Sequence, residues 1–125
     1  MTQLRELYKC DKCGNVVQIL HQGAPALVCC GENMEQLEAQ TADPAEQKHV
    51  PVVEETTDGI EVVVGSTHHP MEEEHYIKFI EVLTTEQVLR AELDRDQDPI
   101  AQFNVAKDEV IEVREYCNLH GLWKA

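Results

Sequence analysis

The sequence predicts an all-β protein in two parts, a small metal-stapled N-terminal domain and an antiparallel β-sandwich. Four of the five cysteines lie within the first thirty residues, as in domains that a metal ion holds together. Farther along, short runs of β-forming residues alternate with turn-forming residues. The charge also changes, because residues 1–37 carry 4 acidic and 3 basic groups whereas residues 38–125 carry 20 and 7. We therefore expect domains at residues 1–37 and 38–125.

The composition narrows the range of partners and compartments. With 24 acidic and 10 basic side chains, the chain has a net charge of −14, which disfavours nucleic acid and anionic membranes as partners. No apolar run approaches the roughly 20 residues of a membrane span. The first nine residues lack the apolar segment of a signal peptide. An odd number of cysteines without a secretion signal favours metal thiolates over disulfides, so we expect a cytoplasmic location.

The N-terminal cysteines have the spacing of a metal site. Cys10 and Cys13 form a C-x-x-C pair followed by Gly14, and Cys29 and Cys30 are adjacent. A segment of about 37 residues cannot bury a self-sufficient core, so bonds to a metal ion are expected to stabilise it. Four thiolates predict a tetrahedral site, which either zinc or iron satisfies. A redox dithiol is the alternative for the C-x-x-C pair, although the helix that such motifs normally open is absent.

The rest of the chain reads as a series of strands. Asp58-Gly59 is a hairpin-turn signal between two of the expected strands. Residues 84–93 are ambiguous, because Thr84 and Gln87 fit a helix capping box whereas alternating apolar residues fit a strand. Six or seven short strands at this spacing indicate an antiparallel sandwich, so we predict a strand there. The other expected strands are 50–53, 60–64, 76–83, 101–105 and 110–116.

Cys117 lies far from the other cysteines, three residues before His120. A thiol beside an imidazole offers a nucleophile–base pair or two metal ligands. His49, His69 and His75 lie beside expected strands, where they can converge at one rim of a sandwich. Four imidazoles and one thiolate exceed the four ligands of a structural zinc site and suit iron with one open position.

Other polar residues near these motifs compete for the same roles. His68 competes with His69, but Pro70 restricts the residue before it to extended geometry, which favours His69. The acidic run 72–74 and His21 are interpreted as solvated loop residues.

Two groups of motifs resemble a known family. C-x-x-C-G-N and L-V-C-C-G resemble desulforedoxin and the N-terminal domain of desulfoferrodoxin, the two-iron superoxide reductase. The segments 48–51, 69–75 and 115–121 resemble the superoxide reductase domain of the desulfoferrodoxin and neelaredoxin family, which is an immunoglobulin-like β-sandwich. The resemblance covers essentially the whole chain.

This resemblance implies two iron ions per chain. The N-terminal iron would have four thiolate ligands, Cys10, Cys13, Cys29 and Cys30. The second iron would have four imidazoles in a plane and one thiolate on the axis, namely His49, His69, His75, His120 and Cys117. The implied activity is the one-electron reduction of superoxide to hydrogen peroxide. The implied partners are a rubredoxin-like electron donor and a second copy of the chain in a homodimer.

The family resemblance also assigns two residues beside the second iron. Lys48 matches the family lysine that borders the open position, where a positive charge would attract superoxide. The family usually has glutamate before this lysine, and this chain has Gln47. In the family this glutamate can bind the open position of the oxidised iron. Because a neutral amide oxygen is a weaker ligand for ferric iron than a carboxylate, we expect Gln47 to bind there only weakly.

Three other functions fit part of the sequence. A metal-stabilised electron carrier or zinc-binding interaction module explains the N-terminal cysteines but leaves the histidines unused. A non-haem iron oxygenase normally has two histidines and one carboxylate, which an axial cysteine does not match. A hydrolase built on Cys117 and His120 lacks a recognisable oxyanion hole.

Overall fold

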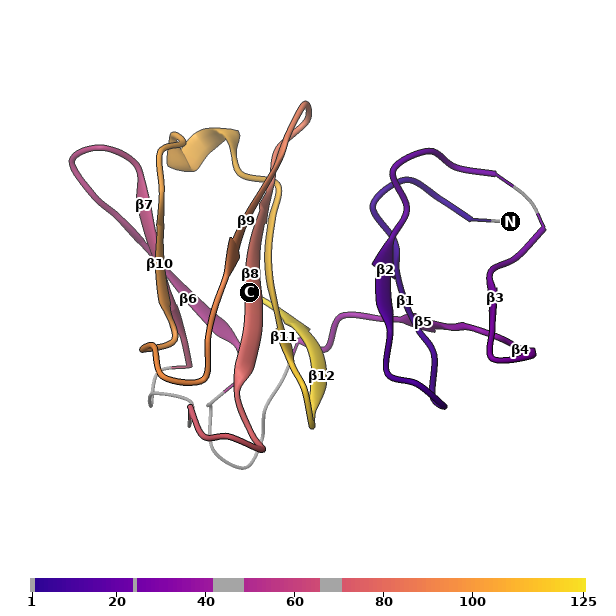
Figure 1. Ribbon diagram of the computed structural model, residues 1–125. Helices are drawn as coiled ribbons and strands as arrows, with labels where there is room; N and C mark the ends of the chain where they lie inside the picture. Colours follow the sequence, from indigo (N-terminus) through magenta and orange to yellow (C-terminus); the bar gives the residue numbers. More distant parts are fainter. Residues whose placement is uncertain (1, 24, 42–48, 66–70) are drawn as a thin grey trace. The chain divides into compact units, whose positions relative to one another are not determined.

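The computed structural model describes residues 2–23, 25–41, 49–65 and 71–125, and the chain forms two compact units, Met1–Glu38 and Ala39–Ala125 (Figure 1). Apart from one short 3-10 turn, Lys107–Glu109, the regular structure of the described residues is entirely β-strand. None of the described segments forms a helix that is long and apolar enough to cross a membrane. The predicted all-β fold class is confirmed.

The first unit consists of short antiparallel strands. β1 (Leu7–Lys9) lies between β2 (Val16–Gln18) and β5 (Glu35–Leu37) in a three-stranded sheet. β3 (Val28–Cys29) and β4 (Glu32–Asn33) form a separate two-stranded hairpin.

The first unit has only a small apolar core. Its buried apolar residues, among those that the structure describes, are Leu7, Cys10 and Ile19. By contrast, Leu20 is 81% exposed and Val28 is 66% exposed. Hydrophobic burial therefore contributes little to the stability of this unit, and metal–thiolate bonds are expected to contribute much of it.

The second unit is an antiparallel sandwich of a three-stranded and a four-stranded sheet, as in seven-stranded immunoglobulin-like domains (Figure 1). The first sheet has the order β10-β7-β6, with β6 at Pro51–Glu55, β7 at Ile60–Val64 and β10 at Ile100–Phe103. The second sheet has the order β12-β11-β8-β9, with β8 at Ile77–Leu83, β9 at Val88–Glu92, β11 at Glu112–Cys117 and β12 at Gly121–Lys124.

Aliphatic side chains fill the space between the sheets. In β7, alternate residues Ile60, Val62 and Val64 are completely buried, as the period of two along a strand requires. Ile80 and Val82 of β8 belong to the same core cluster. The sandwich therefore has the continuous core that the first unit lacks.

The ambiguous segment after β8 is a strand, as predicted. Thr84 does not cap a helix. Its hydroxyl oxygen accepts hydrogen bonds from the backbone N–H groups of Glu86 and Gln87, at 3.2 and 2.9 Å. These bonds close a tight turn that leads directly into β9, where Leu83 pairs with Val88.

A row of charged side chains crosses the four-stranded sheet. Glu81 is completely buried, and Arg90 and Arg114 lie opposite it on the two neighbouring strands. Their Nε atoms donate to the two carboxylate oxygens of Glu81 at 2.7 and 2.8 Å. The burial of this carboxylate was not predicted, since an isolated glutamate in a strand normally faces solvent. Removing one partner of such a buried pair typically costs about 3–5 kcal/mol.

We predict that Gly59→Ala destabilises the second unit by about 1–3 kcal/mol, the usual cost of overpacking. A Cβ at this turn would collide with the carbonyl oxygen of Phe103 and lie 3.0 Å from the backbone nitrogen of Val105. Denaturant unfolding followed by the fluorescence of Trp123, the single tryptophan, measures the change. Asp58→Ala, at an exposed position in the same turn, is the matched control and should change stability by about 0.5 kcal/mol or less. Equal stability of the two variants would contradict the steric argument.

Candidate metal centres

The four N-terminal cysteines converge, with all four sulfur atoms within 4.8 Å of one another. The Sγ atoms of Cys13 and Cys29 are 3.6 Å apart, and those of Cys29 and Cys30 are 3.9 Å apart. A tetrahedron with metal–sulfur bonds of 2.3 Å has sulfur–sulfur edges of about 3.8 Å. The observed separations therefore fit one tetrahedral metal ion.

Backbone geometry explains how two adjacent cysteines reach the same site. Cys29 ends β3, and Cys30 follows with a φ of +52°, in the left-handed region that few residues other than glycine adopt. This turn aims the two neighbouring side chains at a common point. Gly31, with a φ of +78°, continues the turn into β4. The adjacent pair, which departs from the usual repeated C-x-x-C pattern, is thus compatible with a single metal ion.

The pKa values of these thiols indicate that the four-sulfur site favours a bound cation. Backbone N–H donation, first from Cys13, lowers the pKa of Cys10 to about 7. Hydrogen bonds to the sulfurs of Cys10, Cys13 and Cys29 raise the pKa of Cys30 to about 12. Sulfur atoms this close cannot all lose their protons unless a positive ion offsets their charges. A tetrathiolate set of this kind suits iron.

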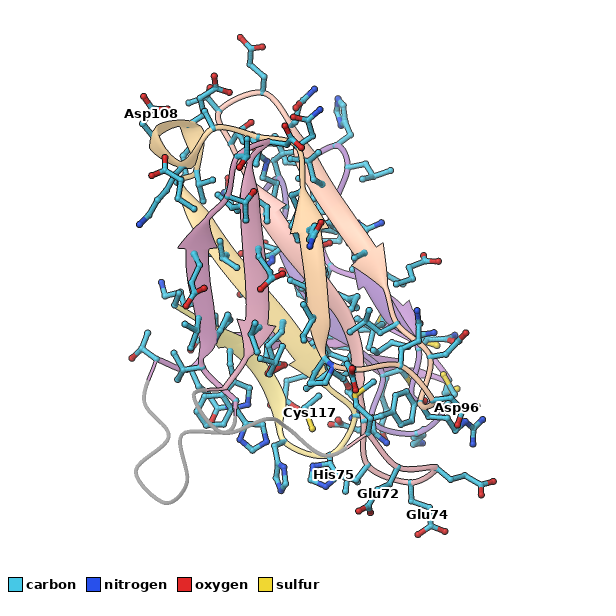
Figure 2. All side chains as sticks on the ribbon, turned by 90° about the vertical axis from the view of Figure 1, so that its left-hand side faces the viewer. Glu72, Glu74, His75, Asp96, Asp108 and Cys117 are labelled. Atoms are coloured by element: carbon cyan, nitrogen blue, oxygen red, sulfur yellow. The ribbon has the colours of Figure 1, made fainter. Side chains whose placement is uncertain are left out.

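A second cluster lies at one end of the sandwich. The potential ligand atoms of His49, His75, Cys117 and His120 all lie within 4.8 Å of one another. The Nε2 atom of His49 is 3.0 Å from Nδ1 of His120, and the Sγ atom of Cys117 is 3.9 Å from the same Nδ1. Figure 2 shows Cys117 and His75 at this end and Asp108 at the opposite end.

Strand pairing brings Cys117 to this cluster. Tyr116 pairs with Phe79, but Cys117 pairs with Ile77, so one residue of β8 is skipped at a β-bulge. Bulges of this kind redirect side chains and are common beside functional sites. Cys117 is consequently 0% exposed and points into the end of the core, where the turn that follows brings His120 back towards it.

Burial raises the pKa of the Cys117 thiol, and the nearby carboxylate of Glu115 adds to this effect. The backbone N–H groups of His120 and Leu119 oppose it. A buried thiol with a raised pKa is a poor nucleophile, which argues against the hydrolase alternative. As a thiolate it requires a nearby cation, so the three imidazoles and one sulfur fit a metal ion.

Several predicted residues cannot be placed in this cluster. His69, Lys48 and Gln47 lie outside the described residues, as does His68. The side chains of residues 72–74 are exposed, and Glu72 and Glu74 point away from the cluster in Figure 2, in keeping with their interpretation as loop residues. No carboxylate joins the cluster within the described part of the chain, so the donor set does not match the oxygenase pattern.

Asn15 ends the C-x-x-C-G-N motif but was given no role in the sequence analysis; its Nδ2 atom lies 4.0 Å from Sγ of Cys29 and donates to it. Hydrogen bonds to thiolate ligands raise the reduction potential of an iron centre. With iron bound, we predict that Asn15→Leu lowers the potential by at most roughly 40 mV, the one-electron equivalent of about 1 kcal/mol. Spectroelectrochemical titration measures it, with Asn33→Leu, an exposed asparagine in β4, as the control. An unchanged or higher potential would refute the role of Asn15.

Comparisons with protein families cover nearly the whole chain. The sequence-family model for desulfoferrodoxin matches residues 41–125, and the family model for the desulfoferrodoxin N-terminal domain matches residues 2–37. The desulfoferrodoxin of Syntrophotalea carbinolica is 50% identical over 125 residues, which are 100% of this chain and 98% of that protein.

Solved structures agree with this assignment. The superoxide reductase of Treponema pallidum has a TM-score of 0.76 and 30% identity, and the match covers 96% of this chain and 95% of that chain. The one-iron superoxide reductase of Giardia intestinalis has a TM-score of 0.53 and 29% identity, over 64% of this chain and 96% of that chain. With its four-cysteine cluster and its histidine–cysteine cluster, the chain belongs to the desulfoferrodoxin family and carries two iron centres.

Proposed function

We propose that this protein is a superoxide reductase, whose second iron centre reduces superoxide to hydrogen peroxide. The observation that carries the proposal is the convergence of three imidazoles and one buried thiol in a member of the desulfoferrodoxin family. Its solved structural neighbours include superoxide reductases. One electron and two protons convert superoxide into hydrogen peroxide without breaking the O–O bond. Ferrous iron held by these residues would supply the electron.

The proposed ligands of the second iron are His49, His69, His75, His120 and Cys117. Cys117 is completely buried, which keeps water from the sulfur and maintains its donation of charge to the metal. His49 is buried, but His75 is half-buried and His120 is exposed, so solvent reaches the cluster at its His120 edge. This contrast between a buried sulfur and an exposed His120 suits a site that binds a diffusible substrate.

The chain must attract an anion despite its net charge of −14. We propose that Lys48, next in sequence to the ligand His49, supplies the local positive charge. At physiological salt a single charge acts over about 8 Å. A lysine ammonium group can also hold the water that provides a proton. Gln47, at the position of the family glutamate, would be a weak ligand at most.

We propose that the four-cysteine centre transfers electrons and does not bind substrate, because Cys10, Cys13, Cys29 and Cys30 complete a tetrahedral coordination. An external donor, rubredoxin-like by the family resemblance, would restore the ferrous state of the second centre. The domain division at 1–37 and 38–125 is supported by the two compact units. A homodimer and a cytoplasmic location remain predictions.

The first test replaces the proposed thiolate ligand. Cys117→Ser should abolish superoxide reduction, because a serine hydroxyl does not donate charge as a thiolate does, while the iron content falls from about two per chain to about one. Pulse radiolysis and metal analysis of the protein, pre-reduced chemically, measure both quantities. Cys13→Ser is the reciprocal control and should disturb only the first centre. A Cys117→Ser variant that consumes superoxide at the parent rate would rule out the assignment.

The second test concerns the attraction of the substrate. Lys48→Ala should lower the second-order rate constant for superoxide, and the loss should shrink as salt rises, because ions screen the lysine charge. Lys48→Arg should retain most of the rate. Lys107→Ala, an equal change of charge at an exposed position beside Asp108 at the other end of the sandwich, should have little effect (Figure 2). A loss that does not depend on salt would show that Lys48 acts in another way.

A further inference from the structure

The backbone carbonyl of His120 accepts two side-chain hydrogen bonds. The Nε2 atom of Gln40 donates to it at 2.9 Å, and the indole Nε1 of Trp123 donates at 3.1 Å. These donors come from residues 80 positions before and three positions after His120. Together they can occupy both lone pairs of the carbonyl oxygen and so fix the orientation of the peptide group.

Gln40 is itself held in place by the backbone of β12. Its N–H donates to the carbonyl of Leu122 at 2.9 Å, and its carbonyl accepts from the N–H of Lys124 at 2.9 Å. Gln40 forms a parallel bridge with Trp123 through this pairing. The Gln40 side chain therefore extends from a fixed backbone towards the turn that carries His120.

The turn lies close against this amide. Gly121 has a φ of +90°, a conformation that strains other residues, and a Cβ there would be 3.4 Å from Nε2 of Gln40. The same amide also approaches the carbonyl of Leu122 at 3.4 Å. The Gln40 amide therefore contacts the carbonyl groups of the residues before and after Gly121, where the chain passes from His120 into β12.

Trp123 connects two of the proposed ligands. Its indole stacks on the imidazole of His49, with ring centroids 4.8 Å apart and an interplanar angle of 19°. Its N–H at the same time binds the carbonyl of His120. Since Trp123 is buried, its ring is fixed by packing and can hold the plane of the His49 ring.

His120 needs such support more than the other members of the cluster. Cys117 belongs to the buried core cluster and His49 is buried against Trp123, whereas His120 is exposed. The ring of His120 contacts the rings of His49 and His75, at centroid distances of 4.7 and 4.9 Å, but these are themselves members of the cluster. The position of His120 depends on the turn that carries it, and hydrogen bonds to that turn therefore act on a ligand atom that they do not touch.

We propose that Gln40 and Trp123 are positioning residues of the second iron centre, which together hold His120 and His49 ready for the metal ion. The inference rests on the proposed function in taking these two histidines as ligands. Gln40 is the second residue of the sandwich unit, so the segment that follows the first unit in the chain contributes directly to the geometry of the second centre.

The test compares Gln40→Leu, Trp123→Phe and the double variant, each loaded with iron, in competition with a ferrous chelator. Trp123→Phe keeps an aromatic ring against His49 but removes the N–H donor. We expect the double variant to bind the second iron about 10–100-fold more weakly, the usual effect of losing the partners of a ligand, and each single variant to lose less. The thiolate-to-iron absorption and the electron paramagnetic resonance of the oxidised centre should shift in parallel.

Two controls separate positioning from general destabilisation. The four-cysteine iron of the same molecule should keep its affinity and spectrum. Gln102→Leu removes an exposed glutamine of β10, whose Nε2 donates to Glu61 at 3.1 Å, and should leave the second centre unchanged. Gln40 is also exposed, so Gln40→Leu tests the proposal even if the double variant does not fold.

The results that would overturn the proposal are distinct from a failure of the proposed function. Parent-like iron affinity and spectra in Gln40→Leu and in the double variant would overturn it, and so would equal losses in Gln102→Leu or at the first centre. If the function itself were wrong, the parent protein would hold both irons and yet fail to consume superoxide. The chelator and spectroscopic measurements do not depend on that activity.

Discussion

Charge balance around sulfur is the constraint on which both units depend. The four sulfurs of the first unit lie within 4.8 Å of one another, and the buried thiol of Cys117 lies beside three imidazoles. The first group cannot lose all four of its thiol protons at neutral pH without a nearby cation, because the pKa of Cys30 is raised to about 12, and burial likewise raises the pKa of Cys117. Iron satisfies both groups, and in the first unit it also stabilises a fold with very little apolar core.

The two centres use opposite structural means to hold their ligands. In the first, short turns with left-handed residues such as Cys30 and Gly31 bring sulfurs together, and the metal ion itself completes the fold. In the second, the aliphatic core between the two sheets supports the strands that carry the ligands, and the cluster lies at the end of that core. A site supported by a rigid sandwich can leave one side chain, here His120, exposed, whereas a site that stabilises its own domain needs complete coordination.

Polar interactions complete the support where the apolar core cannot reach. The ion pairs of Glu81 with Arg90 and Arg114 join three neighbouring strands of the sheet that carries Cys117. At the rim, Gln40 and Trp123 hold the carbonyl of His120. Both sets of interactions act on β11 or on the turn that follows it. The elements that carry the second centre are therefore held by polar contacts as well as by hydrophobic packing.

The sequence by itself determined the all-β class, the strand after Thr84 and the identity of most of the clustered donors, because period-two patterns and ligand spacing are local properties. Only the tertiary structure decided the β-bulge at Cys117, the complete burial of Glu81 and the contacts of Gln40. These features arise from pairing between residues distant in the chain. Gln40 and His120 are 80 positions apart, and no local sequence pattern predicts which backbone carbonyl a distant side chain will bind.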